Sequence, residues 1–470
     1  MPNYPIYAGG KFVTTSQKLE VINPFSGKKF AETYLAGEAE YEAAVQAALG
    51  VREEMKQLPA YRRYEILGAV STAISDRRGQ LAIILAMESG KPLRLAQAEI
   101  DRAAQTFRVA AEESKRLPKE YISLDWTPAG EKREGIVKYF PVGAVAGISP
   151  FNFPMNLAVH KIAPAIAAGC PILLKPASST PLSTLELAKM IDLTGLPKGA
   201  LSVLPMTRTM GNKLVTDERF RLLSFTGSPE VGWEMKKNAG KKKVVLELGG
   251  NAGVIVMPSA SISSALEKSL AGAFAYSGQI CIHAQRFFVH ESIFDDFLEN
   301  MTQAAKSLRY GDPGDPATDV SVMIDEANAL RVEAWVNEAI HAGAKLCCGG
   351  KREGSFYHPT ILTGTKASMK VCAEEIFGPV ITVEPVSSMR EAITRVNEGV
   401  FGLQAGVFTN DIREMDEAFD GLEVGGMILN DVPTFRVDHM PYGGVKDSGL
   451  GREGVRYAMM DMLEARVLVK

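Results

Sequence analysis

The sequence predicts an α/β protein with two doubly wound α/β domains and a small additional β element. Between Pro141 and Gly250, short β-branched runs alternate with amphipathic runs, as in a parallel sheet covered by helices. The alternation resumes from Asn251 to about Glu453. At 470 residues the chain also exceeds the size at which one core usually keeps growing, so more than one domain is expected.

The segments before and between these domains have other patterns. Short strand-like pieces reach to Gly37 and are expected on the surface of the first domain. From Glu38 to Arg116, apolar residues recur every three or four positions, which predicts helices over one face of a sheet. Two alternating runs at 121–140 predict a hairpin, and 454–470 ends in another strand-like run.

These patterns divide the chain into three parts. Residues 1–120 and 141–250 are expected to bind a nucleotide, because nucleotides bind at the carboxyl ends of such strands. Residues 251–453 form the second, catalytic α/β domain. Residues 121–140 and 454–470 lack a sheet of their own, so we expect them to pair across a subunit interface in a homodimer or homotetramer. The alternative is a local hairpin on the monomer surface.

The composition argues against several classes of protein. The 52 basic and 55 acidic residues nearly cancel, and no basic run is long enough to indicate nucleic acid binding. The five cysteines are odd in number and lack C-x-x-C spacing, which argues against a disulfide framework or a zinc site. The N-terminus lacks a signal pattern and no apolar run approaches membrane-spanning length. We therefore expect a soluble cytoplasmic protein with no metal site and no membrane contact.

Two side chains between Val244 and Ile282 can carry chemistry. Glu247 ends a β-branched run just before a glycine pair, and Cys281 follows a helical segment. A thiolate is a strong nucleophile, and a carboxylate in a partly dry site can take a proton from water. Together they suit a covalent acyl-transfer cycle. Taken alone, the thiol is more often a small core residue and the acid a solvated turn.

Two glycine motifs are candidates for binding a phosphate. In SFTGSPEVG, Gly227 permits a tight turn, Ser228 is a good N-cap and Pro229 suits the first helical position. Such a helix start offers free N–H groups to a pyrophosphate, or is simply a well-capped helix. The literal G-x-G-x-x-G at 449–454 lies too near the C-terminus for the helix, strand and acid that a dinucleotide site needs.

Seven motifs, in order along nearly the whole chain, resemble the NAD(P)-dependent aldehyde dehydrogenase superfamily. They are SPFNFP, KPAS, FTGSPEVG, LELGG, GQIC, EEIFGP and MPYGGVKDSGLGRE. The residues in and around these motifs most resemble the branch that contains lactaldehyde, non-phosphorylating glyceraldehyde-3-phosphate and succinate-semialdehyde dehydrogenases. The resemblance implies oxidation of a small aldehyde to the acid with NAD or NADP, and this branch of the family includes hydroxy-, carboxy- and phospho-substituted aldehydes among its substrates.

The resemblance also implies three catalytic roles. Cys281 would attack the aldehyde as a thiolate, and the Asn152 amide with the Cys281 N–H would hold the oxyanion. Hydride transfer would leave a thioester, and Glu247 would activate the water that releases the acid. A CoA-acylating dehydrogenase and a catalytically silent scaffold are the alternatives. The retained Glu247 argues against the first, and the retained Cys281 and Asn152 argue against the second.

For the cofactor, Lys175 resembles the ligand of the adenosine ribose, Glu375 the ligand of the nicotinamide ribose, and Phe377 its ring contact. The full set implied is Ser149, Pro150, Phe151, Lys175, Ser178, Gly211, Phe225, Thr226, Gly227, Ser228, Glu375 and Phe377. Ser178 stands where many NAD-preferring members carry a Glu, so the repulsion of a 2′-phosphate is lost. Arg208 lies in the next loop, and the choice between NAD and NADP stays open.

Motif alignment places four residues near the substrate: Arg102, His283, Arg436 and Tyr442. An arginine there would favour an aldehyde with a carboxylate, phosphate or hydroxyl tail. The alternative is that the arginines make structural or subunit salt bridges.

Overall fold

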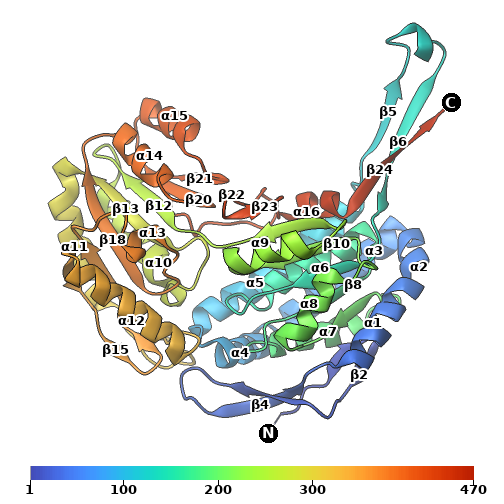
Figure 1. The fold of residues 1–470 in the computed structure, drawn as a ribbon, viewed down its shortest axis with the longest axis horizontal. Helices are drawn as coiled ribbons and strands as arrows, with labels where there is room; N and C mark the ends of the chain where they lie inside the picture. Colours follow the sequence, from blue (N-terminus) through green and yellow to red (C-terminus); the bar gives the residue numbers. More distant parts are fainter. Residues whose placement is uncertain (1) are drawn as a thin grey trace.

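The computed structural model describes residues 2–470 and has the predicted α/β architecture. Figure 1 shows two lobes, each with a sheet between helices, and an arm of three strands that projects away from them. Among the described helices, none is both long and apolar enough to cross a membrane.

The sheet of the first lobe has eight strands, whose five central members are parallel. In spatial order they are β2 (Lys11–Val13), β1 (Ile6–Ala8), β9 (Leu201–Val203), β8 (Ile172–Lys175), β7 (Val145–Ile148), β10 (Leu222–Thr226), β11 (Lys243–Glu247) and β23 (Gly449–Leu450). Successive side chains point to opposite faces. In β10, for example, Leu222 joins the core on one face and Leu223 the core on the other.

Helices fill both faces of this sheet. One face packs against α2 (Arg52–Gln57), α3 (Ala60–Asp76), α4 (Arg78–Ser89), α5 (Leu93–Ser114), α6 (Asn156–Ala168), α7 (Leu182–Asp192) and α16 (Val455–Asp461). The other packs against α1 (Glu38–Gly50), α8 (Arg208–Thr216) and α9 (Pro229–Asn238). Helix α6 is buried along its whole length, so it lies at the centre of the lobe.

The second lobe has a seven-stranded sheet that is parallel except for β14 at one edge. Its order is β14 (Lys345–Cys348), β17 (Thr360–Thr363), β18 (Val380–Val386), β13 (Ala284–His290), β12 (Ala252–Val256), β20 (Gln404–Phe408) and β21 (Gly426–Leu429). Its helices are α10 (Ile262–Phe274), α11 (Phe294–Ser307), α12 (Glu326–His341), α13 (Lys370–Ala373), α14 (Met389–Asn397) and α15 (Ile412–Gly421).

The remaining strands form small sheets. The arm combines β5 (Lys119–Ser123), β6 (Glu134–Pro141) and β24 (Leu463–Val469), with β6 in the middle. A hairpin of β3 (Lys18–Ile22) and β4 (Lys29–Tyr34) lies at the bottom of Figure 1. Short two-stranded pieces pair β15 (Arg352–Glu353) with β16 (Phe356–Tyr357), and β19 (Phe401–Gly402) with β22 (Val445–Lys446).

Two expectations about the ends of the chain need correction. Strand β1 is buried and extends the first sheet rather than lying on its surface, because its three apolar residues pack on the core. At the other end, β23 pairs with β11 of the first lobe although it falls within 251–453. Helix α16 packs on α6, so 454–470 contributes only β24 to the arm. The C-terminal segment thus returns to the first lobe beside Glu247.

Candidate active site

The carboxyl ends of the first-lobe strands are in register, which gathers the predicted cofactor residues at one edge. Ile148, the last residue of β7, pairs with Lys175 of β8 and Phe225 of β10. Thr226, at the end of β10, pairs with Glu247 at the end of β11. The segments that leave these strands therefore start side by side, as in other nucleotide-binding α/β sheets.

A cleft between α8 and α9 lies beside this edge. Its volume is about 580 Å³, and Arg208, Asn212, Glu230 and Glu234 are among its lining residues. Thr207 caps α8, where its side chain accepts a hydrogen bond from the N–H of Met210. The Thr207 cap thus stabilises the start of α8, the helix that carries Arg208.

Lys175 leaves β8 with almost no partner of its own. Among residues 2–470 its Nζ contacts only the carbonyl of Pro176, at 3.5 Å, and burial lowers the pKa of its ammonium group. A Cβ on Gly211 would lie 2.8 Å from the Lys175 stem, so the glycine gives the lysine its space. The Ser178 hydroxyl contacts the carbonyl of Met206, at 3.5 Å. An ammonium group with donors left unpaired suits a hydroxyl-rich or phosphorylated ligand.

The turn from β10 to α9 has the predicted form. Ser228 is the N-cap in extended conformation, and Pro229 begins the helix. The N–H of Gly227 donates to the Glu247 carbonyl at 3.0 Å, which ties the turn to β11. Phe225 is buried, and the hydroxyl of Thr226 accepts a hydrogen bond from Lys161 at 2.7 Å. The N-terminus of α9 faces the strand edge with its orphan N–H groups, as a pyrophosphate requires.

The second lobe contributes two residues opposite this turn. One oxygen of Glu375 accepts the N–H of Gly250 at 2.9 Å, and burial raises the pKa of this carboxyl to about 7. A Cβ on Gly249 would clash with the carboxylate, so only glycine fits there. Phe377 meets Phe151 of the first lobe edge to face, with ring centroids 5.9 Å apart.

Near these two rings, Pro150 of the first lobe is partly exposed, and the hydroxyl of buried Ser149 has no partner in the described chain. The cleft and the unpartnered groups of the first lobe, with Glu375 and Phe377 opposite them, fit a dinucleotide.

Cys281 follows a strained turn. Tyr276 and Ser277, just after α10, have φ values of 50° and 53°, which L residues rarely adopt. Two hydrogen bonds hold the turn, from the Tyr276 hydroxyl to the Ser89 carbonyl at 3.0 Å and from the Ser277 hydroxyl to the Ser321 carbonyl at 2.6 Å. Burial raises the pKa of the Cys281 thiol to about 11. The turn thus fixes the position of the sulfur.

Asn152 is buried and anchored on both sides. Its amide nitrogen donates to the Gln279 carbonyl at 3.0 Å, and its backbone carbonyl accepts a hydrogen bond from Lys91 at 2.7 Å. Lys91 also pairs with Glu99, which accepts the N–H groups of Met155 and Asn156. A side-chain amide has two hydrogens, so one remains for an oxyanion near Cys281. Lys91 and Glu99 are therefore a buried support that the motifs did not reveal.

Glu247 is 3% exposed, and neither carboxylate oxygen has a hydrogen-bond partner among residues 2–470. Burial, and then the charge of Glu453, raise the pKa of this carboxyl well above its usual range. Two backbone hydrogen bonds between Tyr442 and Glu453, of 3.0 and 2.6 Å, close the glycine-rich loop over it. A buried carboxylate with raised pKa and no partner is what a general base for water needs.

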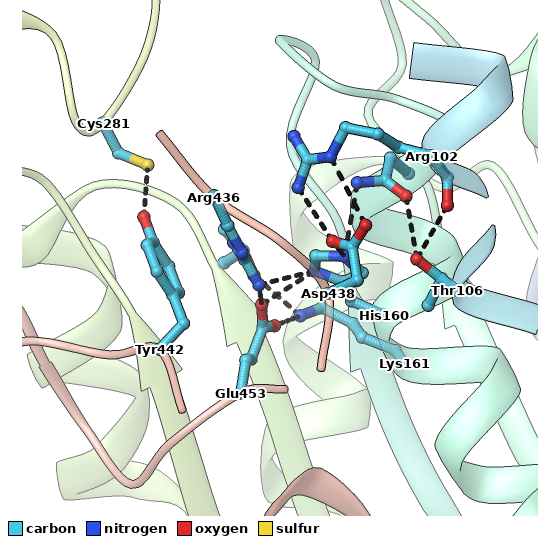
Figure 2. A network of polar contacts seen from close by, with 11 residues as sticks. Arg102, Thr106, His160, Lys161, Cys281, Arg436, Asp438, Tyr442 and Glu453 are labelled. Carbon is cyan, nitrogen blue, oxygen red and sulfur yellow. Dashed lines mark hydrogen bonds and ion pairs between the residues drawn. The ribbon is translucent and has the colours of Figure 1, made fainter. Parts of the chain in front are cut away.

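A network of charged side chains, buried except for the partly exposed Arg102, runs from this loop to α5, as Figure 2 shows. Arg436 donates to Glu453 at 2.9 Å and to His160 at 2.9 Å, and its guanidinium carbon lies 3.6 Å from the ring centroid of Tyr442. The other nitrogen of His160 contacts Asp438 at 2.8 Å. Asp438 also accepts from Arg102, at 2.8 Å.

Burial opposes the charge of both acids in this network, yet their neighbours keep them ionised. Lys161, His160 and Arg436 hold the pKa of Glu453 well below its usual range. His160 and Arg102 do the same for the pKa of Asp438. The salt bridges predicted as the alternative for the two arginines are thus present. The buried Nε of Arg436 nevertheless has no partner within the described chain.

His283 lies apart from this network. One ring nitrogen contacts the Ala273 carbonyl of α10 at 2.8 Å, and burial lowers the pKa of the ring to about 4. Tyr442 contacts both Cys281 and Arg436, and Arg102 is linked to Arg436 through Asp438 and His160. Within the described chain, the contacts of His283 do not join it to these residues.

The motif reading missed His160, Lys161, Asp438 and Glu453. One signal was present: a His-Lys pair interrupts the otherwise apolar run of α6, and charged residues are almost never fully buried unless paired. The partners could not be named, because Glu453 lies 292 positions from Lys161.

Comparison with known proteins gives a consistent result. Residues 12–468 match the model of the aldehyde dehydrogenase family. The chain is 42% identical over 468 residues to the 3-sulfolactaldehyde dehydrogenase of Priestia megaterium, covering 99% of this chain and 98% of that protein.

Two solved structures are also similar. The crystal structure of aldehyde dehydrogenase 21 from Physcomitrella patens, in complex with the reaction product succinate, is 44% identical with a TM-score of 0.98 and covers 100% of this chain and 98% of its own. That of the glyceraldehyde-3-phosphate dehydrogenase GapN from Methanocaldococcus jannaschii, complexed with NADP, is 39% identical with a TM-score of 0.93 and covers 97% and 100%. The chain therefore belongs to the aldehyde dehydrogenase family and oxidises an aldehyde to the carboxylic acid with NAD or NADP.

Proposed function

We propose that this enzyme acts on a small aldehyde whose far end carries an anionic group. The observation that carries the proposal is Arg436, whose unpartnered Nε is buried beside Tyr442, which in turn contacts Cys281. A guanidinium binds a carboxylate, sulfonate or phosphate through paired N–H groups. Arg102 adds a second positive charge on the far side of Asp438.

The three relatives described above support an anionic substrate. One is a 3-sulfolactaldehyde dehydrogenase, one was crystallised with its reaction product succinate, and one is a glyceraldehyde-3-phosphate dehydrogenase. 3-Sulfolactaldehyde, succinate and glyceraldehyde-3-phosphate differ in their charged group, but each is an anion. The shared chemistry is a short chain with an acidic tail.

In the proposed cycle Cys281 attacks the aldehyde carbon, and the free amide hydrogen of Asn152 holds the oxyanion. When bound, the nicotinamide of NAD(P) supplies the acceptor for the hydride. Lys175, Glu375 and Phe377, with the start of α9, would hold the cofactor in place. Glu247 then takes a proton from the water that releases the acid.

The test compares succinate semialdehyde with its neutral methyl ester. We expect a lower KM for the anion, by about tenfold or more, the usual worth of a hydrogen bond to a charged group. Arg102→Met should raise the KM for the anion and leave that for the ester nearly unchanged. Arg436→Lys should raise the KM for the anion more than the KM for the ester. Leu193→Lys, on the exposed end of α7, is the control. A wild-type enzyme that prefers the ester would refute the proposal.

We also propose that NADP is accepted as a cofactor. Ser178 carries no charge to repel a 2′-phosphate, and Arg208 lines the cleft between α8 and α9. Glu230 and Glu234 line the same cleft and limit the preference. Arg208→Ala should raise the KM for NADP several-fold more than the KM for NAD; equal changes would rule out contact with the phosphate.

Assembly and location complete the proposal. The arm supports a homodimer or homotetramer, because β24 is an exposed edge strand. Five free cysteines, without a disulfide among them, support a reducing cytoplasm.

A further inference from the structure

The hydroxyl of Tyr442 contacts the sulfur of Cys281. The two atoms are 3.2 Å apart, within hydrogen-bonding range for sulfur, and Tyr442 is 2% exposed. The contact joins residues 161 positions apart, from the turn after α10 and from the C-terminal loop. Figure 2 shows the phenol hydroxyl pointing at the sulfur, with Arg436 beside the ring of Tyr442.

We propose that Tyr442 is a catalytic residue, whose phenolic hydroxyl donates a hydrogen bond to the Cys281 thiolate and stabilises the thiolate relative to the thiol. The inference rests on the proposed function only in taking Cys281 as the nucleophile. While sulfur carries its proton, either atom can donate. Once the thiol has ionised, only the phenol has a hydrogen to give.

The charges around the sulfur explain why such a donor is needed. Burial disfavours the thiolate, and the carboxylates of Glu375 and Glu247 act in the same direction. Tyr442 and Arg436 oppose them, the first by its hydrogen bond and the second by its charge. Burial also raises the pKa of Tyr442 well above its usual range, so the phenol stays protonated and remains a donor.

Arg436 acts in this arrangement as a positioning residue. Its guanidinium carbon lies 3.6 Å from the Tyr442 ring centroid, within the range of a cation–π contact. The ion pair with Glu453 holds the guanidinium, and two backbone hydrogen bonds join Glu453 to Tyr442. The phenol is therefore fixed from its ring face and from its backbone.

The experiment measures how fast iodoacetamide alkylates Cys281 across a pH series, with mass spectrometry identifying the labelled peptide among five cysteines. No aldehyde or cofactor is present, so the result does not depend on the substrate proposed above. Tyr442→Phe, which keeps the ring on Arg436, should raise the apparent pKa of the Cys281 thiol by about one unit. Tyr7→Phe removes another buried phenol, bonded to Asp192, and should leave the profile unchanged.

A second variant changes the donor without removing it. Replacement of Tyr442 by 3,5-difluorotyrosine makes the phenol more acidic and a stronger donor, so the pKa of the thiol should fall. This variant keeps the shape of the side chain and stands even if Tyr442→Phe does not fold. An unchanged profile in either folded variant, or shifts of the opposite sign, would overturn the role of Tyr442. A failed preference for anionic aldehydes would overturn only the substrate.

Discussion

At the scale of single residues, substitutions of Glu247 and of Cys281 should block different steps of the reaction. Cys281→Ala removes the nucleophile and should abolish NAD(P)H formation. Glu247→Gln keeps the nucleophile but loses the base, so stopped-flow absorbance should show a burst of up to one NAD(P)H per site and then almost no turnover. Both variants are compared with wild type at one pH. A normal steady-state rate in the Glu247→Gln enzyme would contradict the role of Glu247 as the general base.

Glu247 should also weaken the fold in which it acts. Because the folded state raises the pKa of this carboxyl, the folded protein binds its proton more tightly than the unfolded chain does. Stability is therefore lost as pH rises above the unfolded pKa of about 4.3. At pH 8 we expect Glu247→Gln to be more stable, on the order of 1–3 kcal/mol, the cost of an unsatisfied buried group.

Denaturant unfolding at two pH values tests this prediction. The advantage of Glu247→Gln should shrink toward pH 4, where the carboxyl is protonated in both states. Glu230→Gln, on the surface of α9, is the control for the loss of one negative charge. A variant less stable than wild type at pH 8 would show that the buried carboxylate has a stabilising partner.

Catalysis should increase with pH in the alkaline range. Burial raises the pKa of the Cys281 thiol to about 11, so the thiolate fraction grows about tenfold per pH unit below that value. The raised pKa of Glu247 acts in the same direction, because its base form also increases with pH. We expect log kcat/KM to rise between about pH 7 and 9 with a slope of one or more. A flat profile would contradict a thiol that starts protonated.

Single residues also show which parts of the candidate site could not be predicted from the sequence. Cys281, Glu247 and Asn152 could be proposed from the sequence because each lies in a short motif with a fixed order. Lys161 and Glu453 could not be paired, because their contact depends on how the C-terminal loop returns to α6. The same return decides that Arg436 lies over Tyr442. Buried charge networks of this kind are set by tertiary packing, which local patterns do not encode.

At the scale of elements, the start of α6 depends on α5 and on the end of α4. Glu99 of α5 accepts two N–H groups at the start of α6, and Lys91 holds the carbonyl of Asn152 just before it. Lys91→Met alone should cost about 3–5 kcal/mol, because Glu99 is left buried without its cation. The double variant Lys91→Met/Glu99→Gln removes both charges and should fold.

In that double variant we expect kcat to fall about tenfold or more, with KM nearly unchanged, because the oxyanion amide is no longer held in place. Adding Asn152→Ala should cost little further, since both changes remove one interaction. Steady-state kinetics on the four combinations measures this coupling. Independent, additive losses would show that Lys91 and Glu99 serve stability alone.

The sequence predicts the long periodic elements better than the short strands. The alternation from 141 to 250 and the helices from 38 to 116 have strong periodicity, and both appear in the structure. Strand β1 has three residues, and β23 has two, so neither is long enough to show a period. Their places in the sheet come from pairing with distant strands, β1 with β9 and β23 with β11.

At the scale of the whole molecule, the arm is the feature that one chain does not explain. Figure 1 shows β5, β6 and β24 extending away from both lobes. Strand β24 lies at the edge of this sheet, and all of its residues after Leu463 are exposed. Val467, Leu468 and Val469 are each about half exposed, at 54%, 53% and 46%. An apolar edge strand of this kind pairs with another chain or aggregates.

We therefore expect light scattering to give wild type two or four times the mass of one chain. Val467→Lys/Val469→Lys places two charges on one face of β24 and should reduce the mass toward that of one chain. Leu193→Lys changes an exposed apolar residue away from the arm and should keep the assembly intact. Because Cys281, Tyr442 and Arg436 contact one another within one chain, single chains that remain folded should retain Cys281 alkylation. A wild-type protein with the mass of one chain would refute the assembly, and an unchanged mass in the double variant would place the interface elsewhere.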